Sequence, residues 1–274
     1  MSEPGGETEI TAFYALGFER ERLQHGAGVL ELKRTQTLLE RFLPAPPAGI
    51  VDIGGGPGRY AIWLAGKGYR VHLVDQVALH VEQARAAALE SHATLASAEV
   101  GDARALGLPD ESVDAALLLG PLYHLQERAD RVRALAEARR VCRPGGVIIW
   151  AVISRFASML DGLRNGFLED PVFAAIAAHD LRDGRHRNPT DNPSYFTTAY
   201  FHRPEEVADE CAAAGLAHEA MIAIEGPAWL LADLEVRLAD ERRRRVLLDA
   251  LAQLESETAL LGVSAHLLSV ARRK

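Results

Sequence analysis

The stretch Ile50-Val51-Asp52-Ile53-Gly54-Gly55-Gly56-Pro57-Gly58-Arg59-Tyr60-Ala61 decides how this sequence folds. Its apolar start predicts a buried strand, and its glycines predict a tight turn that leads into a helix. Such a turn lets the backbone approach a ligand closely, and the first turn of the helix offers unpaired N–H groups. The stretch therefore predicts a ligand site at the carboxyl end of a strand.

Outward from this stretch, short apolar runs alternate with longer amphipathic runs. This alternation is typical of a parallel sheet covered by helices. We expect strands at 49–53, 70–74, 94–100, 113–119 and 147–154, and two late strands at 217–224 and 264–271. The clearest helix is 126–142, which Arg143-Pro144-Gly145-Gly146 ends. The predicted fold is a doubly wound α/β fold with a mostly parallel seven-stranded sheet.

Two segments lie outside this alternation. Residues 19–43 predict a helix with breaks near Gly26 and Gly28, and we assign residues 1–48 to an N-terminal helical lid. Turn signals between 155 and 203 separate short helical pieces, which we interpret as a helical and loop cap inserted into the fold. The α/β core is expected over 49–154, with its C-terminal part over 204–274.

Composition excludes several classes of protein. The 274 residues are 48% hydrophobic, and the formal net charge of −8 repels nucleic-acid phosphates and anionic lipid. Cys142 and Cys211 have no second thiol or histidine at a ligand spacing, so no disulfide and no metal site is expected. No apolar run is long enough to span a bilayer, and we expect a cytoplasmic monomer or homodimer with no membrane partner.

Two of three acids at the strand ends discriminate between two adenine-containing cofactors. Residues 56–61 alone fit the GxGxxA dinucleotide fingerprint, so a nicotinamide-dependent dehydrogenase is an alternative. Asp52 lies two positions before the first glycine, where an acid suits a cationic amino-acid tail better than a pyrophosphate. Asp75 closes the second strand and could accept both ribose hydroxyls of either cofactor. Asp102 follows the third strand and could accept a hydrogen bond from an adenine amino group.

This ordered set of glycines and acids resembles the class I S-adenosylmethionine-dependent methyltransferase family, of the small-molecule type, over about 49–154. The resemblance implies a Rossmann-like core that binds S-adenosyl-L-methionine and releases S-adenosyl-L-homocysteine. It places Asp52, Gly54, Gly56 and Gly58 around the methionine part, Asp75 at the ribose and Asp102 at the adenine. Further expected cofactor-binding residues are Gln76, Ala103, Gly120, Tyr14 and Arg34, of which Arg34 could pair with the methionine carboxylate.

The loop after the fourth strand is where this family presents the methyl group to its acceptor. It lacks the Asn/Asp-Pro-Pro-Tyr/Phe signature of enzymes that methylate amide or nucleobase nitrogens, which favours a small-molecule acceptor. We expect His124 to act as general base where the acceptor must lose a proton, the alternative being a histidine packed behind the loop. Tyr123 is expected to line the methyl site.

The cap contributes a cluster of polar and aromatic residues, as small-molecule pockets use. We expect His186, Tyr195, Tyr200 and His202 to bind the acceptor, the alternative being a solvated loop that its aromatics pin to the core. The expected reaction is an in-line displacement that moves a methyl group to oxygen, nitrogen or carbon of a small metabolite. A module that binds the cofactor without turnover is the remaining alternative.

Overall fold

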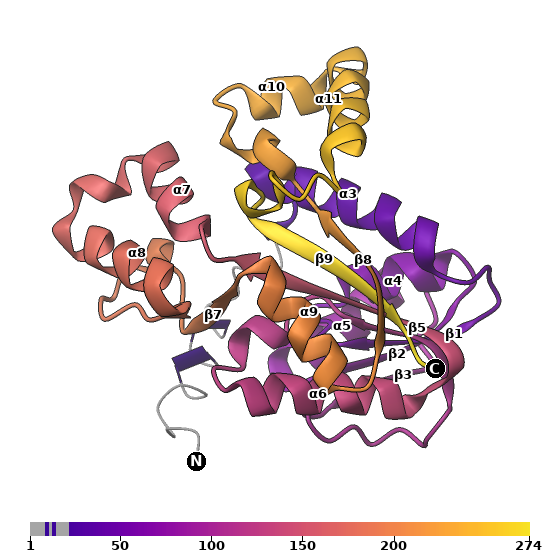
Figure 1. The fold of residues 1–274 in the computed structure, drawn as a ribbon. Coiled ribbons are helices and arrows are strands. Elements are labelled where there is room, and N and C mark those ends of the chain that lie inside the picture. The colour runs from indigo at the N-terminus through magenta and orange to yellow at the C-terminus, as the bar shows by residue number, and fades with distance from the viewer. Residues whose placement is uncertain (1–8, 11–12, 15–21) are drawn as a thin grey trace. The chain divides into compact units, whose positions relative to one another are not determined.

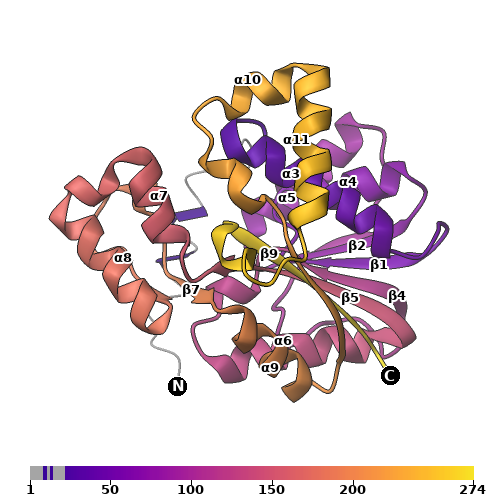
Figure 2. The ribbon, with the colours of Figure 1, turned by 45° about the horizontal axis from the view of Figure 1, so that its top comes forward.

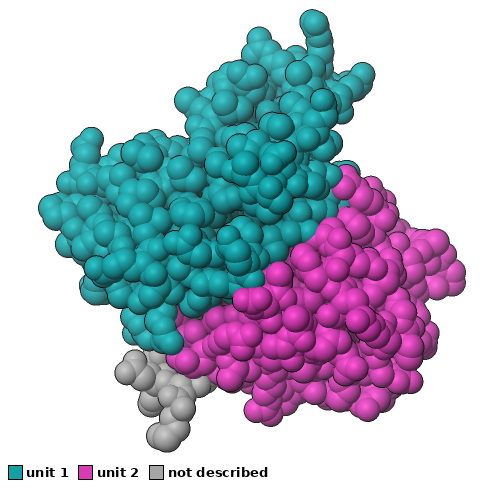
Figure 3. Space-filling model, viewed as in Figure 1, with its two compact units in different colours: residues 1–38, 152–207, 221–268 teal, residues 39–151, 208–220, 269–274 magenta. Residues whose placement is uncertain are grey.

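The computed structural model describes residues 9–10, 13–14 and 22–274 of the chain. The chain forms two compact units (Figure 3). The core unit comprises residues 39–151, 208–220 and 269–274. The accessory unit comprises residues 1–38, 152–207 and 221–268. Residues 221–268 therefore group with the predicted cap and lid, although the sequence places them in the C-terminal part of the core.

The core unit, in which Figure 1 labels β1, β2, β3 and β5, is built on parallel strands in the order β3-β2-β1-β4-β5. All five residues of β1 are buried, as expected for a central strand that helices cover on both faces. Because the strands are parallel, the carboxyl ends of β1 to β4 lie along one edge of the sheet. The bounds are β1 Gly49–Ile53, β2 Arg70–Asp75, β3 Ser97–Val100, β4 Val113–Leu118 and β5 Cys142–Ser154.

Strand β5 begins five residues before the predicted strand start. Residues 143–146, which the sequence predicts to end the preceding helix, lie inside β5. Gly145 donates its N–H to the Arg273 carbonyl at 2.8 Å, and Arg273 donates to the Gly146 carbonyl at 3.0 Å. This pairing with the C-terminal strand satisfies the backbone that the Pro-Gly-Gly pattern alone predicts to be a turn. Strand β3, in contrast, begins at Ser97, three residues after the predicted position.

The structure confirms the mostly parallel sheet with flanking helices that the sequence predicts. Strand β9 pairs with both β5 and β8, which confirms the two late strands. Helices α6 and α9 lie side by side (Figure 2), joined by a buried ion pair between Arg131 and Glu210. The bounds are α4 Arg59–Gly66, α5 Ala78–Glu90, η1 Leu122–His124, α6 Arg128–Val141, α9 Pro204–Ala213, β8 Ala217–Ala223 and β9 His266–Arg272.

The accessory unit contains the predicted helical pieces and a short hairpin that the sequence analysis did not predict. Strand β7 (Ala199–His202) pairs in parallel with residues 153–154 of β5 and antiparallel with β6 (Arg185–His186). The remaining elements are α7 Ala157–Asn165, η2 Phe167–Glu169, α8 Pro171–Asp183, η3 Pro193–Tyr195, η4 Gly226–Leu230, α10 Leu234–Ala239, α11 Glu241–Leu254 and η5 Leu261–Val263. No helix among the described residues is long and apolar enough to cross a membrane.

Helix α3 (Gly26–Phe42) explains why residues 221–268 belong to the accessory unit. Its Leu30 is fully buried among apolar side chains of η4, α10 and α11, including Ala228, Leu238 and Leu251. Gly28 lies inside α3, so the break predicted there does not occur. Residues 19–21 of the predicted helix lie outside the described part of the chain.

Candidate functional site

The glycine loop after β1 adopts backbone angles that favour glycine. Gly54, Gly56 and Gly58 have φ values of 67°, 55° and 85°, in the left-handed region. The Gly54 N–H donates to the Val74 carbonyl of β2 at 2.7 Å, which holds the turn against the neighbouring strand. A Cβ atom on Gly54 would lie only 2.7 Å from a ring carbon of Pro121, so this position also requires the absence of a side chain.

Gly55 is a site residue that the motif spacing did not single out. A Cβ atom at this position would lie 2.8 Å from Oδ2 of Asp52 and 3.0 Å from a methyl carbon of Leu73. The turn therefore passes directly over the Asp52 carboxyl group. No sequence signal marks Gly55, because it occupies a variable position of the glycine pattern.

Asp52 is a buried acid beneath the glycine loop. The residue is 1% exposed, and neither carboxyl oxygen makes a well-formed hydrogen bond with a described residue. Burial and the nearby negative charge of Asp75 raise the pKa of Asp52 to about 7, and the backbone amide of Ala61 only partly offsets this increase. A buried carboxyl group without a partner fits a ligand that brings a cation to this loop.

Asp75 has ample hydrogen-bond partners. One carboxyl oxygen accepts the Gly56 N–H at 2.8 Å, and the other accepts the Val77 N–H at 2.8 Å. The second oxygen also lies 3.2 Å from Nδ1 of His80 on α5. Asp75 thus fixes the glycine loop to the end of β2, and a carboxylate has lone pairs left for a ligand. Its role at a ribose stays a prediction.

Asp102 follows β3, and its main partner is Arg104, which the sequence analysis did not single out. The Arg104 guanidinium contacts both carboxyl oxygens, with an Nη2 to Oδ2 distance of 2.7 Å, and also reaches Asp130 at 3.2 Å. Although partial burial raises the pKa of Asp102, the hydrogen bonds and charge of Arg104 lower it overall. The planar Arg104 guanidinium lies next to Asp102, the acid predicted to bind the adenine. Arg104 is therefore a further candidate contact for the adenine base.

The other predicted cofactor residues of the core unit follow the same strand ends. Gln76 is exposed after β2, and Ala103 and Gly120 are partly buried after β3 and β4. A Cβ atom on Gly120 would lie 3.5 Å from both the Gly54 carbonyl and the Tyr123 hydroxyl. The structure therefore brings the loops after β1 and β4 together, as the predicted site requires.

The predicted catalytic residues lie on η1. Tyr123 is buried and His124 partly buried, and their rings meet edge to face with centroids 4.7 Å apart. Arg131 of α6 anchors the residues that follow η1, because it donates to the carbonyls of Leu125 and Gln126 at 2.8 and 2.9 Å. This anchoring gives the η1 loop a fixed geometry. The role of His124 as general base stays a prediction.

The accessory unit contains Arg34, which has protein partners of its own. The buried guanidinium contacts Glu255 at 2.5 Å and the Ile224 carbonyl at 3.0 Å. These contacts neutralise the positive charge that was predicted to meet a methionine carboxylate. Tyr14 packs edge to face against Phe13 with centroids 5.5 Å apart. Cofactor binding by both residues stays a prediction.

Two of the four predicted acceptor residues have clear structural roles. His186 is buried, with Nδ1 2.7 Å from Asp180 and Nε2 2.8 Å from the Tyr195 carbonyl. Tyr195 packs on Phe173, and its hydroxyl donates to Asp170 at 2.7 Å. Protein contacts therefore account for both side chains without an acceptor.

Tyr200 and His202 occupy the same side of strand β7. Tyr200 is partly buried and His202 fully buried, and their rings meet edge to face with centroids 4.7 Å apart. The Arg155 guanidinium lies 5.7 Å from the Tyr200 ring centroid and pairs with Glu206. An aromatic ring backed by a fixed cation could line a pocket, and acceptor binding here stays a prediction.

A second titratable cluster in the accessory unit joins Glu31, Glu225 and His266, whose ligand atoms lie within 4.8 Å of one another. His266 Nδ1 contacts Glu225 at 2.7 Å, and the Arg22 guanidinium pairs with Glu31. Burial alone would lower the pKa of His266, but the two carboxylates raise it to about 8. Arg22 already supplies the cation that Glu31 needs, so we interpret the cluster as an ion-pair network. The expectation that the chain needs no metal stays untested.

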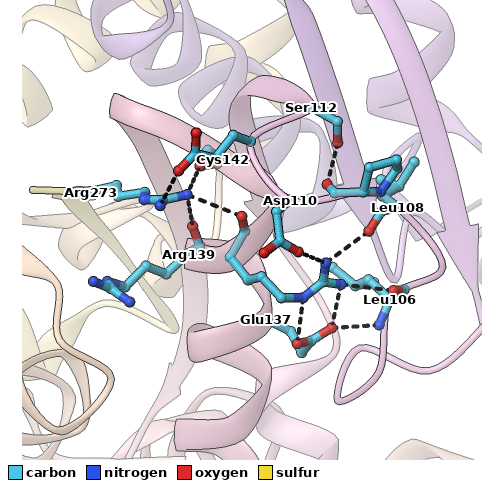
Figure 4. Close-up of polar contacts among 11 residues, drawn as sticks. Leu106, Leu108, Asp110, Ser112, Glu137, Arg139, Cys142 and Arg273 are labelled. Atoms are coloured by element: carbon cyan, nitrogen blue, oxygen red, sulfur yellow. Dashed lines mark hydrogen bonds and ion pairs between the residues drawn. The ribbon is translucent and has the colours of Figure 1, made fainter.

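A network of arginine side chains joins the 106–112 loop, which precedes β4, to the end of α6 (Figure 4). Arg140 contacts Glu137, Asp110 and the Leu106 and Leu108 carbonyls. Arg273 donates to carbonyls at the end of α6, including that of Cys142. These bonds satisfy the last carbonyls of the helix and hold the 106–112 loop, which is a structural role.

Comparison with known proteins agrees with this geometry. Residues 51–150 match the family described as "Methyltransferase domain". The chain is 34% identical over 108 residues to an uncharacterized methyltransferase of Mycobacterium tuberculosis, covering 39% of this chain and 41% of that protein. It is 35% identical over 126 residues to the malonyl-[acyl-carrier protein] O-methyltransferase of Methylococcus capsulatus, covering 44% of each chain. The chain thus spans less than half the length of these curated relatives.

A solved structure extends the likeness of fold beyond the matched segment. An S-adenosylmethionine-dependent methyltransferase of Methanosarcina mazei superposes with a TM-score of 0.58 at 17% sequence identity. The alignment covers 86% of this chain and 96% of that one. The fold likeness therefore extends beyond residues 51–150, which match the family model.

Proposed function

We propose that this chain, whose residues 51–150 form a class I S-adenosylmethionine-dependent methyltransferase domain, transfers a methyl group to a small-molecule acceptor. The observation that carries the proposal is the buried, unpartnered carboxyl group of Asp52 under the glycine loop. A pyrophosphate would bring further negative charge to this carboxyl group, whereas the ammonium group of a methionine tail would pair with it. The site therefore favours S-adenosylmethionine over a nicotinamide dinucleotide.

The residues around the loop have distinct roles in this proposal. When bound, S-adenosylmethionine supplies a methyl group on a positively charged sulfur. The open backbone of Gly54 and Gly56 admits the methionine part, and Asp52 pairs with its ammonium group. Asp75 accepts ribose hydroxyls while it holds the glycine loop in place. Asp102 and Arg104 contact the adenine.

Residues after β4 act on the acceptor. In an in-line displacement the protein mainly aligns the nucleophile with the methyl group and excludes water. Tyr123 lines the methyl position, and His124 removes a proton from the acceptor when the nucleophile carries one. Tyr200 and His202 of the accessory unit bind the acceptor. The net charge of −8 makes a nucleic-acid acceptor unfavourable.

Calorimetric titration tests the cofactor assignment. We expect S-adenosylhomocysteine and S-adenosylmethionine to bind, and Asp75→Ala to weaken both by tenfold or more, because the glycine loop and ribose lose a shared partner. Asp110→Ala is the matched control: its carboxylate pairs with Arg140 at the opposite edge of the sheet, so affinity should stay unchanged. Absence of binding to the unmodified protein would refute the proposed function.

Turnover needs a separate measurement. We expect incubation with isotopically labelled S-adenosylmethionine and a pool of small metabolites to give a labelled methylated product by mass spectrometry. His124→Asn should lower the maximal rate and remove the pH dependence of that rate below neutrality. Tight cofactor binding without any labelled product would instead identify a non-catalytic binding module.

A further inference from the structure

Asp52 and Asp75 are neighbouring buried carboxyl groups whose surroundings differ. Asp75 has two backbone N–H donors at 2.8 Å and a contact to His80 at 3.2 Å. Asp52 has the Ala61 amide nearby but no well-formed hydrogen bond to either oxygen from a described residue. Donors and cations stabilise the charge of a buried carboxylate. Asp75 therefore has surroundings that stabilise a negative charge, whereas Asp52, whose pKa is raised to about 7, favours the protonated form below neutral pH.

Among the described residues, the elements of the core unit packed around Asp52 supply no cation. In the strand register Asp52 aligns with Leu73 of β2 and Leu117 of β4, both buried and apolar. On α4, the Arg59 side chain is exposed, and the Ala61 amide gives only partial compensation. On α5, His80 faces Asp75. Among the described residues of the core unit, the charge that acts on Asp52 is thus the negative one of Asp75.

We propose that binding of the cofactor's ammonium group beside Asp52 expels the proton from this carboxyl group, so that cofactor affinity rises with pH. This inference rests on the proposed function. The O–H bond of Asp52 breaks, its electron pair stays on the carboxylate, and the proton leaves to solvent. The ammonium group keeps its hydrogens, and a neutral acid beside a cation becomes an ion pair.

The size of the effect follows from the acidity of Asp52 in the ligand-free protein. Burial and Asp75 raise the pKa of Asp52 to about 7, so the carboxyl group is mostly protonated at pH 6 and mostly ionised at pH 8. Binding should therefore release about 0.9 proton at pH 6 and about 0.1 at pH 8. Over the same range the affinity should rise about tenfold.

Calorimetry with S-adenosylhomocysteine as the probe measures the released protons directly. Titrations at each pH in two buffers of different ionisation enthalpy give the proton count without any turnover. Asp52→Asn replaces the neutral acid by a neutral amide of similar shape, so at pH 6 it should release about 0.9 proton fewer than the unmodified protein. Asp110→Asn is the control, because Asp110 pairs with Arg140 away from the glycine loop and should not alter the proton count.

Infrared difference spectroscopy of the unmodified protein keeps the test independent of how well the Asp52→Asn variant folds. Addition of S-adenosylhomocysteine at pH 6 should remove the absorption band of one protonated carboxyl group. Tight binding with no proton release at pH 6, or with equal release from the Asp52→Asn variant, would overturn the inference and leave the proposed function intact. Absence of binding at both pH values would overturn the proposed function and the inference with it.

Discussion

At the scale of single residues, Gly55 leaves room for the Asp52 carboxyl group although no sequence motif marks this position. It is absent from the glycines with positive φ, so another residue could adopt its backbone angles. Its importance comes from the space above Asp52, where a Cβ atom would lie 2.8 Å from Oδ2 and 2.9 Å from Cγ. Contacts this short force the carboxyl group or the turn to move.

Gly55→Ala should therefore weaken S-adenosylhomocysteine binding by about tenfold or more, which corresponds to the lower range of overpacking energies. Calorimetric titration measures the change. Gly66→Ala is the matched control, because Gly66 ends α4 and a Cβ atom there meets nothing within 4 Å. Equal affinities for the two variants would show that the turn accommodates a methyl group and that the tight contact has no functional weight.

Helices α6 and α9 form, at the element scale, a support for the loop that carries Tyr123 and His124. Arg131 and Glu210 are both buried, with distances of 2.7 and 2.9 Å between guanidinium and carboxylate. The same guanidinium holds the Leu125 and Gln126 carbonyls. One side chain thus joins two helices and the η1 loop within the core unit.

Arg131→Met should destabilise the protein by about 3 to 5 kcal/mol, because it leaves the Glu210 charge buried without a partner. Arg131→Met combined with Glu210→Leu should recover part of this loss, since no charge then remains buried. Urea unfolding followed by circular dichroism measures both. Arg245→Ala is a control that should change stability by less than about 0.5 kcal/mol, because Arg245 and its partner Glu241 are 71% and 77% exposed. A similarly small effect for Arg131→Met would contradict the supporting role.

At the scale of the whole molecule, two buried groups make folding stability depend on pH. Each compact unit contains one group that binds its proton more tightly in the folded chain than in the unfolded chain. Asp52 in the core unit and His266 in the accessory unit have raised pKa values, of about 7 and about 8. A raised pKa means that the folded chain holds the proton more tightly, so stability is lost as pH rises. For Asp52 the loss runs between about pH 4 and 7, and for His266 between about pH 6.5 and 8.

The free energy of unfolding of the ligand-free protein should therefore fall as pH rises from 6.5 to 8.5, above the range in which the lowered pKa values of His72 and His218 act in the opposite direction. Urea unfolding at several pH values measures this, and His266→Asn should lose the part above pH 6.5, on the order of 2 kcal/mol. The lowered pKa of Glu31 acts in the opposite direction only below this range, because a carboxylate that is stabilised in the fold loses its advantage in acid. A constant stability between pH 6.5 and 8.5 would contradict the His266 assignment.

The sequence by itself determined the sheet, the glycine turn and the acids at the strand ends. Each of these depends on local chemistry, since apolar runs form buried strands and glycines accept left-handed angles. Because parallel strands bring their carboxyl ends to one edge, the placement of Asp52, Asp75 and Asp102 could be inferred from strand order alone. The matched methyltransferase segment, 51–150, covers these same positions.

Only the tertiary structure decided how those groups are paired, because partners come from segments distant in the sequence. Arg34 meets Glu255 across 221 positions, and β5 starts early because Arg273 pairs with Gly145 and Gly146. Asp52 and Asp75 are the same residue type in the sequence, yet the fold gives Asp75 three partners and Asp52 only the nearby Ala61 amide. Whether a buried acid has hydrogen-bond donors is a property of three-dimensional packing. This property distinguishes Asp75, which holds the glycine loop, from Asp52, which is proposed to bind a cation.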